Sequence, residues 1–256
     1  MLLGSVAGGV VIATNHTSAS SAIQSPTEAN SVLYAAAVAS GSLHYTNISS
    51  GSVGGRVVAA SQSGDIGRSE GVQYMASSLG DYEVIVINNM AYMKADLTML
   101  ENTFGYSPTE AAPYVNRWIG FAPTDSPYGA VAADVTVGTT WNNPSVSPTD
   151  DLPQTPEAVS GVSSLGGRSV QSVRYSLHGT NKASNASYSG TETISFSATD
   201  PHLPSSLTEQ ISGTSHQQSS TERVRMTFSG WGEAVSVTAP TGSIPFSTIP
   251  GPTATA

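Results

Sequence analysis

The chain has 256 residues, of which 38% are hydrophobic and 11% charged, with a net charge of −9 at pH 7 and no cysteine. Nine basic residues scattered singly cannot neutralise a nucleic-acid backbone, so nucleic-acid binding is excluded. The lack of cysteine excludes disulfides, cysteine-ligated zinc and thiol catalysis, while a surface rich in Ser, Thr, Gly, Asn and Pro is typical of an extracellular β-rich protein.

The N-terminal segment contains an apolar run over residues 2–13. A membrane-spanning helix needs roughly 20 apolar residues, so this run is too short to cross a bilayer. It fits the apolar region of a secretory signal, with small-residue cleavage candidates at 18–20 and 20–22. We therefore interpret residues 1–26 as a signal-like or anchor segment with a linker, and expect an extracytoplasmic protein, secreted or associated with the cell membrane. A disordered tail is the alternative.

The first half of the chain begins with a predicted helix and continues as strands. Pro26, Thr27 and Glu28 open the helix, and Gly41 ends it. Alternating short segments then follow, separated by glycine-rich breaks and by the turn Asn88–Asn89, which together favour an antiparallel meander. The strands are expected at 43–46, 56–60, 71–75, 83–87 and 91–94.

The centre of the chain is predicted to be helical. Asp96 is a natural N-cap for a helix that ends at Gly105. Further helical pieces are expected at 107–115 and from 127 to 141, with a short strand at 117–119 between them. The segment 143–156 holds several prolines and is read as a loop joining two halves.

The second half alternates apolar and polar residues, which predicts strands with one buried face. These strands are expected at 170–178, 191–198, 222–228 and 234–239, before a flexible tail over 241–256. A sheet that is apolar on one face must be covered there by the central helices. The predicted fold is therefore α+β: a curved antiparallel half-barrel sheet with helices packed on its concave face. We assign 27–249 to a single domain and 250–256 to a flexible tail.

Several stretches carry a resemblance to a known family. They are Ser42–Tyr45, 64–73, 91–94, 117–119, 199–204 and the segment Thr227-Phe-Ser-Gly-Trp-Gly-Glu-Ala-Val-Ser-Val-Thr-Ala-Pro240. In these positions the chain resembles the LppX/LprG-type envelope lipoproteins of actinobacteria. The resemblance implies a LolA-like half-barrel that binds or carries an acylated lipid or glycolipid in the cell envelope, with an envelope transport protein as a further partner. We expect a monomer.

The candidate lipid-binding site is the apolar face shared by the sheet and the helices. Burial there contributes about 0.8 kcal/mol per methylene group, enough to hold an acyl chain without a charged partner. The alternative is a structural or interaction module in which the same side chains simply fill a core and an envelope partner is contacted elsewhere. The expected cavity-lining residues are Leu97, Leu100, Phe104, Val131, Trp141, Val173, Tyr175, Phe196, Met226 and Phe228.

No pattern in the sequence predicts catalysis, a metal or a cofactor. The histidines lack ligand spacing and are each read as surface residues: His16, His44, His178, His202 and His216. Ser215 and His216 lack the glycine that completes a nucleophile elbow, and Asp150–Asp151 is read as a solvated loop rather than a calcium site. We therefore expect a non-enzymatic protein.

Overall fold

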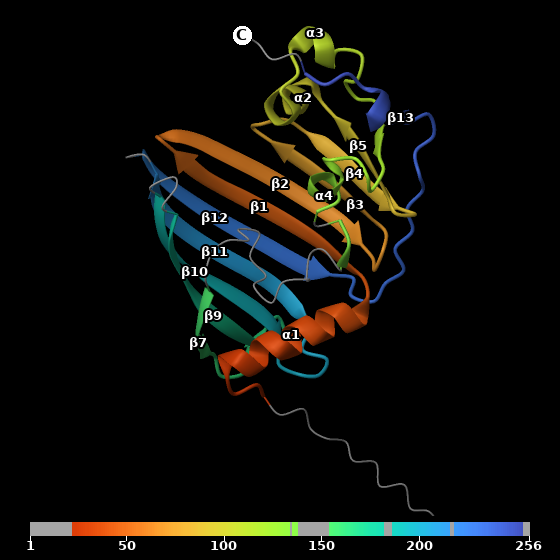
Figure 1. Ribbon diagram of the computed structural model, residues 1–256. Helices are drawn as coiled ribbons and strands as arrows, with labels where there is room; N and C mark the ends of the chain where they lie inside the picture. Colours follow the sequence, from red (N-terminus) through yellow and green to blue (C-terminus); the bar gives the residue numbers. More distant parts are fainter. Residues whose placement is uncertain (1–21, 134, 138–153, 182–185, 216–217, 253–256) are drawn as a thin grey trace, which may run out of the picture.

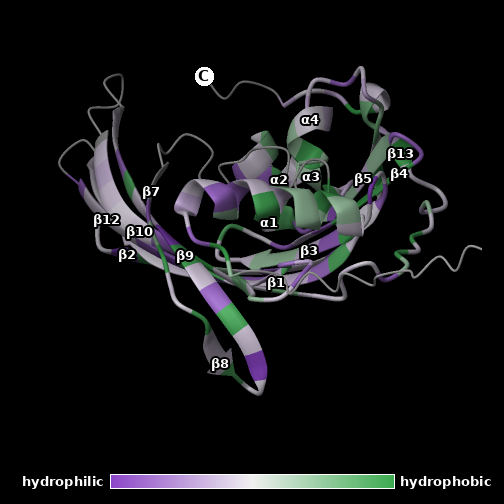
Figure 2. Cartoon of the chain, turned by 90° about the horizontal axis from the view of Figure 1, so that it is seen from below, coloured by the Kyte–Doolittle hydropathy of each residue, from purple (hydrophilic) through white to green (hydrophobic). Residues whose placement is uncertain are grey.

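The computed structural model describes residues 22–133, 135–137, 154–181, 186–215 and 218–252. In Figure 1 they form one large curved sheet, and Figure 2 shows the helices lying inside its curve. The helices are α1 (Pro26–Ser40), α2 (Leu97–Phe104), α3 (Pro108–Ala111), α4 (Tyr128–Val131) and the 3-10 turn η1 (Phe246–Thr248). The strands are β1 (Leu43–Val53), β2 (Arg56–Ile66), β3 (Gly71–Ser77), β4 (Tyr82–Ile87), β5 (Met90–Ala95), β6 (Ile119–Phe121), β7 (Gln154–Val159), β8 (Ser163–Leu165), β9 (Arg168–Asn181), β10 (Ala186–Ser197), β11 (Pro204–Ser215), β12 (Gln218–Ser229) and β13 (Ile244–Pro245).

The sheet is unclosed. Its described strands follow the order β13-β6-β5-β4-β3-β2-β1-β12-β11-β10-β9-β7, with β8 paired to β9 outside this path. Neighbours pair antiparallel except β13 and β6, which pair parallel. Because β13 and β7 lie at opposite ends of the order, the sheet bends without joining into a barrel. The predicted α+β half-barrel, with helices on the concave face, is confirmed.

The helix ends follow the local sequence. The Ser25 side chain accepts a hydrogen bond from the backbone N–H of Glu28 at 3.2 Å, and Gly41 ends α1 with a φ of 77°. Asp96 accepts from the N–H of Met99 at 2.7 Å and so caps α2, as predicted. A reciprocal capping box links Ser107 to Glu110 at the start of α3.

The turn at Asn88–Asn89 is also confirmed. Both residues have positive φ, 54° and 59°, the backbone that a two-residue type I′ hairpin requires. The apolar faces of the later strands agree with the predicted alternation. On β9, for example, Val173, Tyr175 and Leu177 are all buried, while Arg174 is exposed.

Other elements differ from prediction. The expected helix 107–115 shrinks to the four-residue α3. The expected helix 127–141 is interrupted after the four-residue α4; residue 137 is helical again, and residues 134 and 138–141 lie outside the described part of the chain. The expected strand at 234–239 is wrong, because these residues form no strand after the turns at Gly230 and Gly232. The strand β11 was not predicted.

The C-terminal segment 244–249 is ordered against the sheet, contrary to the tail predicted from 241 onward. Ile244 pairs with Ile119 of β6, and the ring of Phe246 stacks on that of Phe121 with centroids 4.9 Å apart. Two aromatic rings and a backbone pairing outweigh the Pro/Thr/Ser-rich composition that favoured flexibility. The boundaries of the single domain, 27–249, stay a prediction.

Candidate functional site: a cavity on the concave face

The concave face carries two separate apolar clusters. The first, the α1 cluster, packs α1 against β1 and the strands of the second half. The second, the α2–α4 cluster, packs the short helices against β4, β5 and β6. Between the two clusters, sheet residues such as Asn47, Gln62 and Met75 have intermediate exposure. Helices therefore cover the concave face in two separate regions, one under α1 and one under α2–α4.

The side chains of the α1 cluster are buried. Val173 and Phe196 are 0% exposed, Tyr175 is 2% and Phe228 is 7% exposed, and Met226 packs against them. These five expected lipid-binding residues share one cluster, and they do not line the central cavity described next. Their contact with a ligand stays a prediction.

A cavity of about 780 Å³ lies between the middle of the sheet and the α2–α4 cluster. We call it the central cavity. Its volume falls in the range of roughly 300–1,000 Å³ that is common for small-molecule sites. It is lined by Asn47, Gln62, Gln73, Met75, Tyr82, Val84, Met93, Met99, Thr103, Phe104, Tyr106, Pro127, Ala130, Val131, Ala133, Phe246, Gly251 and Pro252.

Apolar side chains dominate the walls of the central cavity. Three methionines, Met75, Met93 and Met99, come from β3, β5 and α2. Unbranched methionine side chains adapt their shape to irregular apolar partners. Phe104 and Tyr106 add aromatic surface from the end of α2 and the loop that follows it.

The C-terminal segment forms one side of the central cavity. Phe246 lines it, and the Tyr106 hydroxyl donates to the carbonyl oxygen of Pro250 at 3.1 Å. Gly251 and Pro252 follow at the same wall. The position of this segment at the site was not predicted, because its apolar residues are sparse.

Two of the ten expected lining residues, Phe104 and Val131, line the central cavity. Leu100 is 1% exposed inside the α2–α4 cluster, and Leu97 on the same helix is 37% exposed. Trp141 lies outside the described residues. The three methionines were not predicted from the sequence, since they lie on two strands and a helix whose facing partners depend on the fold.

The base of the central cavity is polar. Asn47, Gln62 and Gln73, on β1, β2 and β3, form what we call the amide floor. The Asn47 amide nitrogen donates to Gln62 Oε1 at 3.3 Å, and the Gln73 amide nitrogen donates to the Tyr82 hydroxyl at 3.4 Å. The floor therefore presents amide groups where the walls are apolar.

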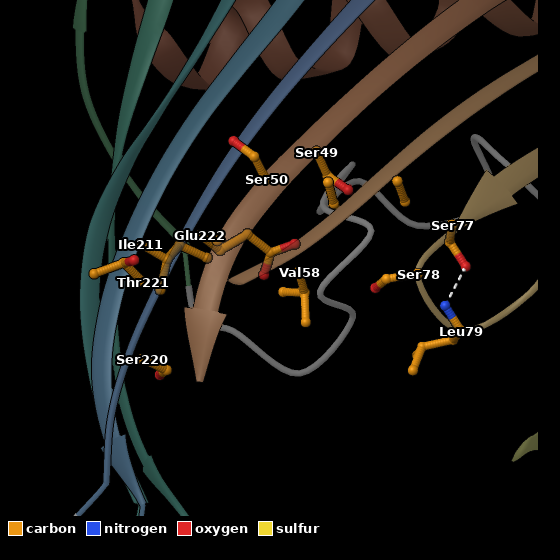
Figure 3. A pocket seen from close by; sticks show the side chains of 13 residues that line it. Ser49, Ser50, Val58, Ser77, Ser78, Leu79, Ile211, Ser220, Thr221 and Glu222 are labelled. Atoms are coloured by element: carbon orange, nitrogen blue, oxygen red, sulfur yellow. Dashed lines mark hydrogen bonds between the residues drawn. The ribbon is translucent and has the colours of Figure 1, made fainter. Parts of the chain in front are cut away.

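A smaller hollow of about 360 Å³ adjoins this region of the sheet. Ser49, Ala60 and Ser77 line it, two residues along their strands from Asn47, Gln62 and Met75 of the central cavity. Figure 3 shows Glu222 of β12 extending toward Val58 across this hollow. Its small side chains leave room next to the amide floor.

Two buried carboxyl groups lie beneath α1. Glu192 on β10 stands directly opposite Glu209 on β11, and the two residues are 0% and 3% exposed. Burial raises the pKa of Glu192 to about 8, and repulsion by Glu209 contributes to the rise. Glu192 therefore carries a proton at neutral pH.

Tyr175 connects this carboxyl pair to α1. It pairs with Glu192 across β9 and β10, and its hydroxyl donates to Asn30 Oδ1. Burial raises the pKa of the Tyr175 phenol, and the charge of Glu192 raises it further. The sequence indicates the buried carboxyl pair only through the position of Glu192, which lies with Ile194 and Phe196 on the face of β10 that is predicted to be buried.

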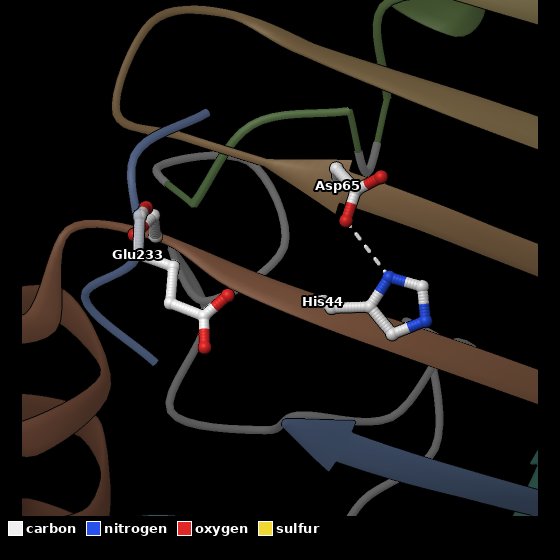
Figure 4. A network of polar contacts seen from close by, with 4 residues as sticks. His44, Asp65 and Glu233 are labelled. Atoms are coloured by element: carbon white, nitrogen blue, oxygen red, sulfur yellow. Dashed lines mark hydrogen bonds and ion pairs between the residues drawn. The ribbon is translucent and has the colours of Figure 1, made fainter. Parts of the chain in front are cut away.

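The histidines occupy different settings. His44 is a surface residue as predicted: its Nδ1 lies 2.8 Å from Asp65 Oδ1, with side chains 43% and 55% exposed, and Figure 4 shows Glu233 on a neighbouring segment. Such an exposed pair contributes little to stability. His178 is exposed, also as predicted.

The prediction of a surface position is wrong for His202, which is 7% exposed. Its ring lies edge-on to Phe196, and Nδ1 is 3.0 Å from the carbonyl oxygen of Ser197. The turn after β10 folds back on the sheet and so buries this ring. His16 and His216 lie outside the described residues.

No group of three or more His, Cys, Asp or Glu side chains in the described part of the chain is arranged to hold a metal ion. Among the helices of the described ranges, none is both long and apolar enough to span a bilayer.

The chain is similar in fold to several solved structures, two of which are described here. No family model matches the sequence, and no curated protein matches it either. A DUF1329 family protein from Desulfovibrio piger is 10% identical, with a TM-score of 0.27 over 83% of this chain and 95% of that one. A LolA superfamily protein from Nitrosomonas europaea is 6% identical, with a TM-score of 0.29 over 80% of this chain and 94% of that one. Similarity at this level does not identify a function, and membership of the LppX/LprG family stays a prediction.

Proposed function

We propose that the protein binds an acylated lipid or glycolipid, with the acyl chain in the central cavity, and carries it without catalysis. The observation that supports the proposal most directly is a hollow of about 780 Å³ with largely apolar walls on the concave face of the sheet. Each methylene group buried there contributes about 0.8 kcal/mol, before the costs of binding are subtracted. An acyl chain gains more from such walls than a polar metabolite does.

The surroundings of the cavity fit a carrier. α4 is only four residues long, and the C-terminal wall contacts the rest of the protein through the two-residue strand β13, one ring stack and the hydrogen bond from Tyr106. Segments with so few contacts open at a lower free-energy cost than the sheet does. In this proposal the protein works outside the cytoplasm as a monomer and receives or delivers its lipid through an envelope transport protein.

A second candidate function has support in the α1 cluster, whose side chains are buried against one another. In that case the protein is a structural or interaction module. Exposed apolar residues such as Ile48 and Val57, 63% and 74% exposed, would then contact the partner. The central cavity favours the lipid carrier.

Filling the cavity tests the carrier function. Ala130 is an exposed residue of α4 that lines the central cavity. The variant Ala130→Trp should place an indole in the acyl-chain space and weaken binding of a fluorescent fatty acid by about tenfold or more, with little loss of stability. Fluorescence titration measures the affinity, and native mass spectrometry checks for lipids that co-purify.

The matched control is Ala112→Trp, since Ala112 is exposed at the end of α3 and does not line the cavity. It should bind the fatty acid as the unmodified protein does. Equal affinity in both variants, or uptake by the unmodified protein of neither the fatty acid nor its neutral methyl ester, would refute the carrier function and favour the interaction module.

A further inference from the structure

The amide floor has acceptor oxygens that the protein itself does not use. Gln73 is 4% exposed, and within the described residues its Oε1 accepts no hydrogen bond; the same is true of Asn47 Oδ1. The nitrogen of each amide is already committed, to Tyr82 and to Gln62 respectively. A buried acceptor without a donor is unfavourable, so a bound group that supplies an O–H or N–H is stabilised here.

The charge of the residues that line the central cavity restricts which lipid head group can bind there. None of the described residues that line the central cavity is an Asp, Glu, Lys, Arg or His. A carboxylate or phosphate placed on the floor would lose its hydration without gaining a counter-charge, and it would face carbonyl oxygens. The arrangement therefore selects against an anionic head group.

We propose that the amide floor recognises a neutral, hydroxyl-bearing head group of the lipid whose acyl chain occupies the cavity. This inference rests on the proposed carrier function and adds the chemical class of the ligand. Asn47 and Gln62 face each other on β1 and β2, and Gln73 follows on β3, so the acceptors form a small patch rather than a single point. A glycerol-like head group can donate to Asn47 Oδ1 and Gln73 Oε1 while its chain extends along the methionines.

The test compares two lipids of equal chain length, a monoacylglycerol with two free hydroxyl groups and a fatty acid methyl ester with none. In competition measured by native mass spectrometry, the unmodified protein should prefer the monoacylglycerol by about tenfold. The variant Gln73→Met, which keeps the length of the side chain and removes one of the two acceptors, should lower this ratio toward one, and binding of the methyl ester is measured in the same variant as the reference. Asn47→Leu is a second variant in case Gln73→Met fails to fold, and thermal melting checks both.

The outcomes separate this inference from the carrier function. If both lipids bind equally and Gln73→Met changes nothing, the head-group inference fails while the carrier function stands. If neither lipid binds, the carrier function itself fails. A preference for the fatty acid anion over the monoacylglycerol would overturn the inference, because it would mean that amide nitrogens face the cavity. Competition by glycerol alone would also overturn it, since the acyl chain would then be unnecessary.

Discussion

Replacing Glu192 with glutamine should stabilise the protein at about pH 8 and flatten the dependence of its stability on pH. In the folded protein the pKa of Glu192 is raised from 4.5 to about 8 by burial and by Glu209. Between these values the unfolded chain releases this proton and the folded protein keeps it, so stability falls as pH rises from 4.5 to 8. The cost is about 1.4 kcal/mol per unit of pKa difference, which amounts to several kcal/mol.

Thermal unfolding measured at about pH 5 and about pH 8 checks this expectation. The melting temperature of the unmodified protein should fall between about pH 5 and about pH 8, whereas that of Glu192→Gln should fall much less. Glu222→Gln is the matched control, because Glu222 is an exposed glutamate of β12 and should leave the pH dependence unchanged. Parallel curves for the unmodified protein and Glu192→Gln would show that the carboxyl pair does not hold the proton.

Truncating Phe196 should cost far more stability than truncating Phe104, while ligand binding should respond in the opposite order. Phe196 is 0% exposed in the α1 cluster, and large-to-small changes at such positions cost about 3–5 kcal/mol. Phe104 is half-buried and lines the central cavity, so Phe104→Ala should weaken fatty-acid binding with a smaller loss of stability. Chemical denaturation and fluorescence titration measure the two effects.

The same pair of variants tests which apolar cluster meets the lipid. Binding lost in Phe196→Ala at a temperature where that variant is folded would place the acyl chain in the α1 cluster, beside five of the ten lining residues expected from the sequence. Binding kept in Phe196→Ala and lost in Phe104→Ala would place it in the central cavity.

Local sequence patterns predicted much of the fold because the signals are local. The caps at Gly41 and Asp96 and the turn at Asn88–Asn89 depend on residues within a few positions. The inward alternation of β9, β10 and β12 follows from side chains that point to opposite faces of a strand. Such elements could be placed without knowing what packs against them.

The site could be predicted only in part because it depends on packing between distant segments. The α1 cluster and the central cavity both contain many apolar residues. The sequence alone does not show which of these residues pack against one another and which line a cavity. Phe246 reaches the cavity through parallel pairing of Ile244 with Ile119, which composition alone does not suggest. The amide floor joins Asn47, Gln62 and Gln73 across three strands, although each is an ordinary polar residue in its own segment.

The position of β1 beside β12 has a consequence for biosynthesis. Thr46 and Thr227, whose hydroxyls lie 2.5 Å apart across these strands, are separated by 181 residues along the chain. During translation β1 leaves the ribosome long before β12 has been synthesised. Until then, the backbone N–H and C=O groups on the edge of β1 that later pairs with β12 can form hydrogen bonds with other chains. Closing so large a loop is slow, and the half-finished nascent chain is therefore the stage most exposed to aggregation.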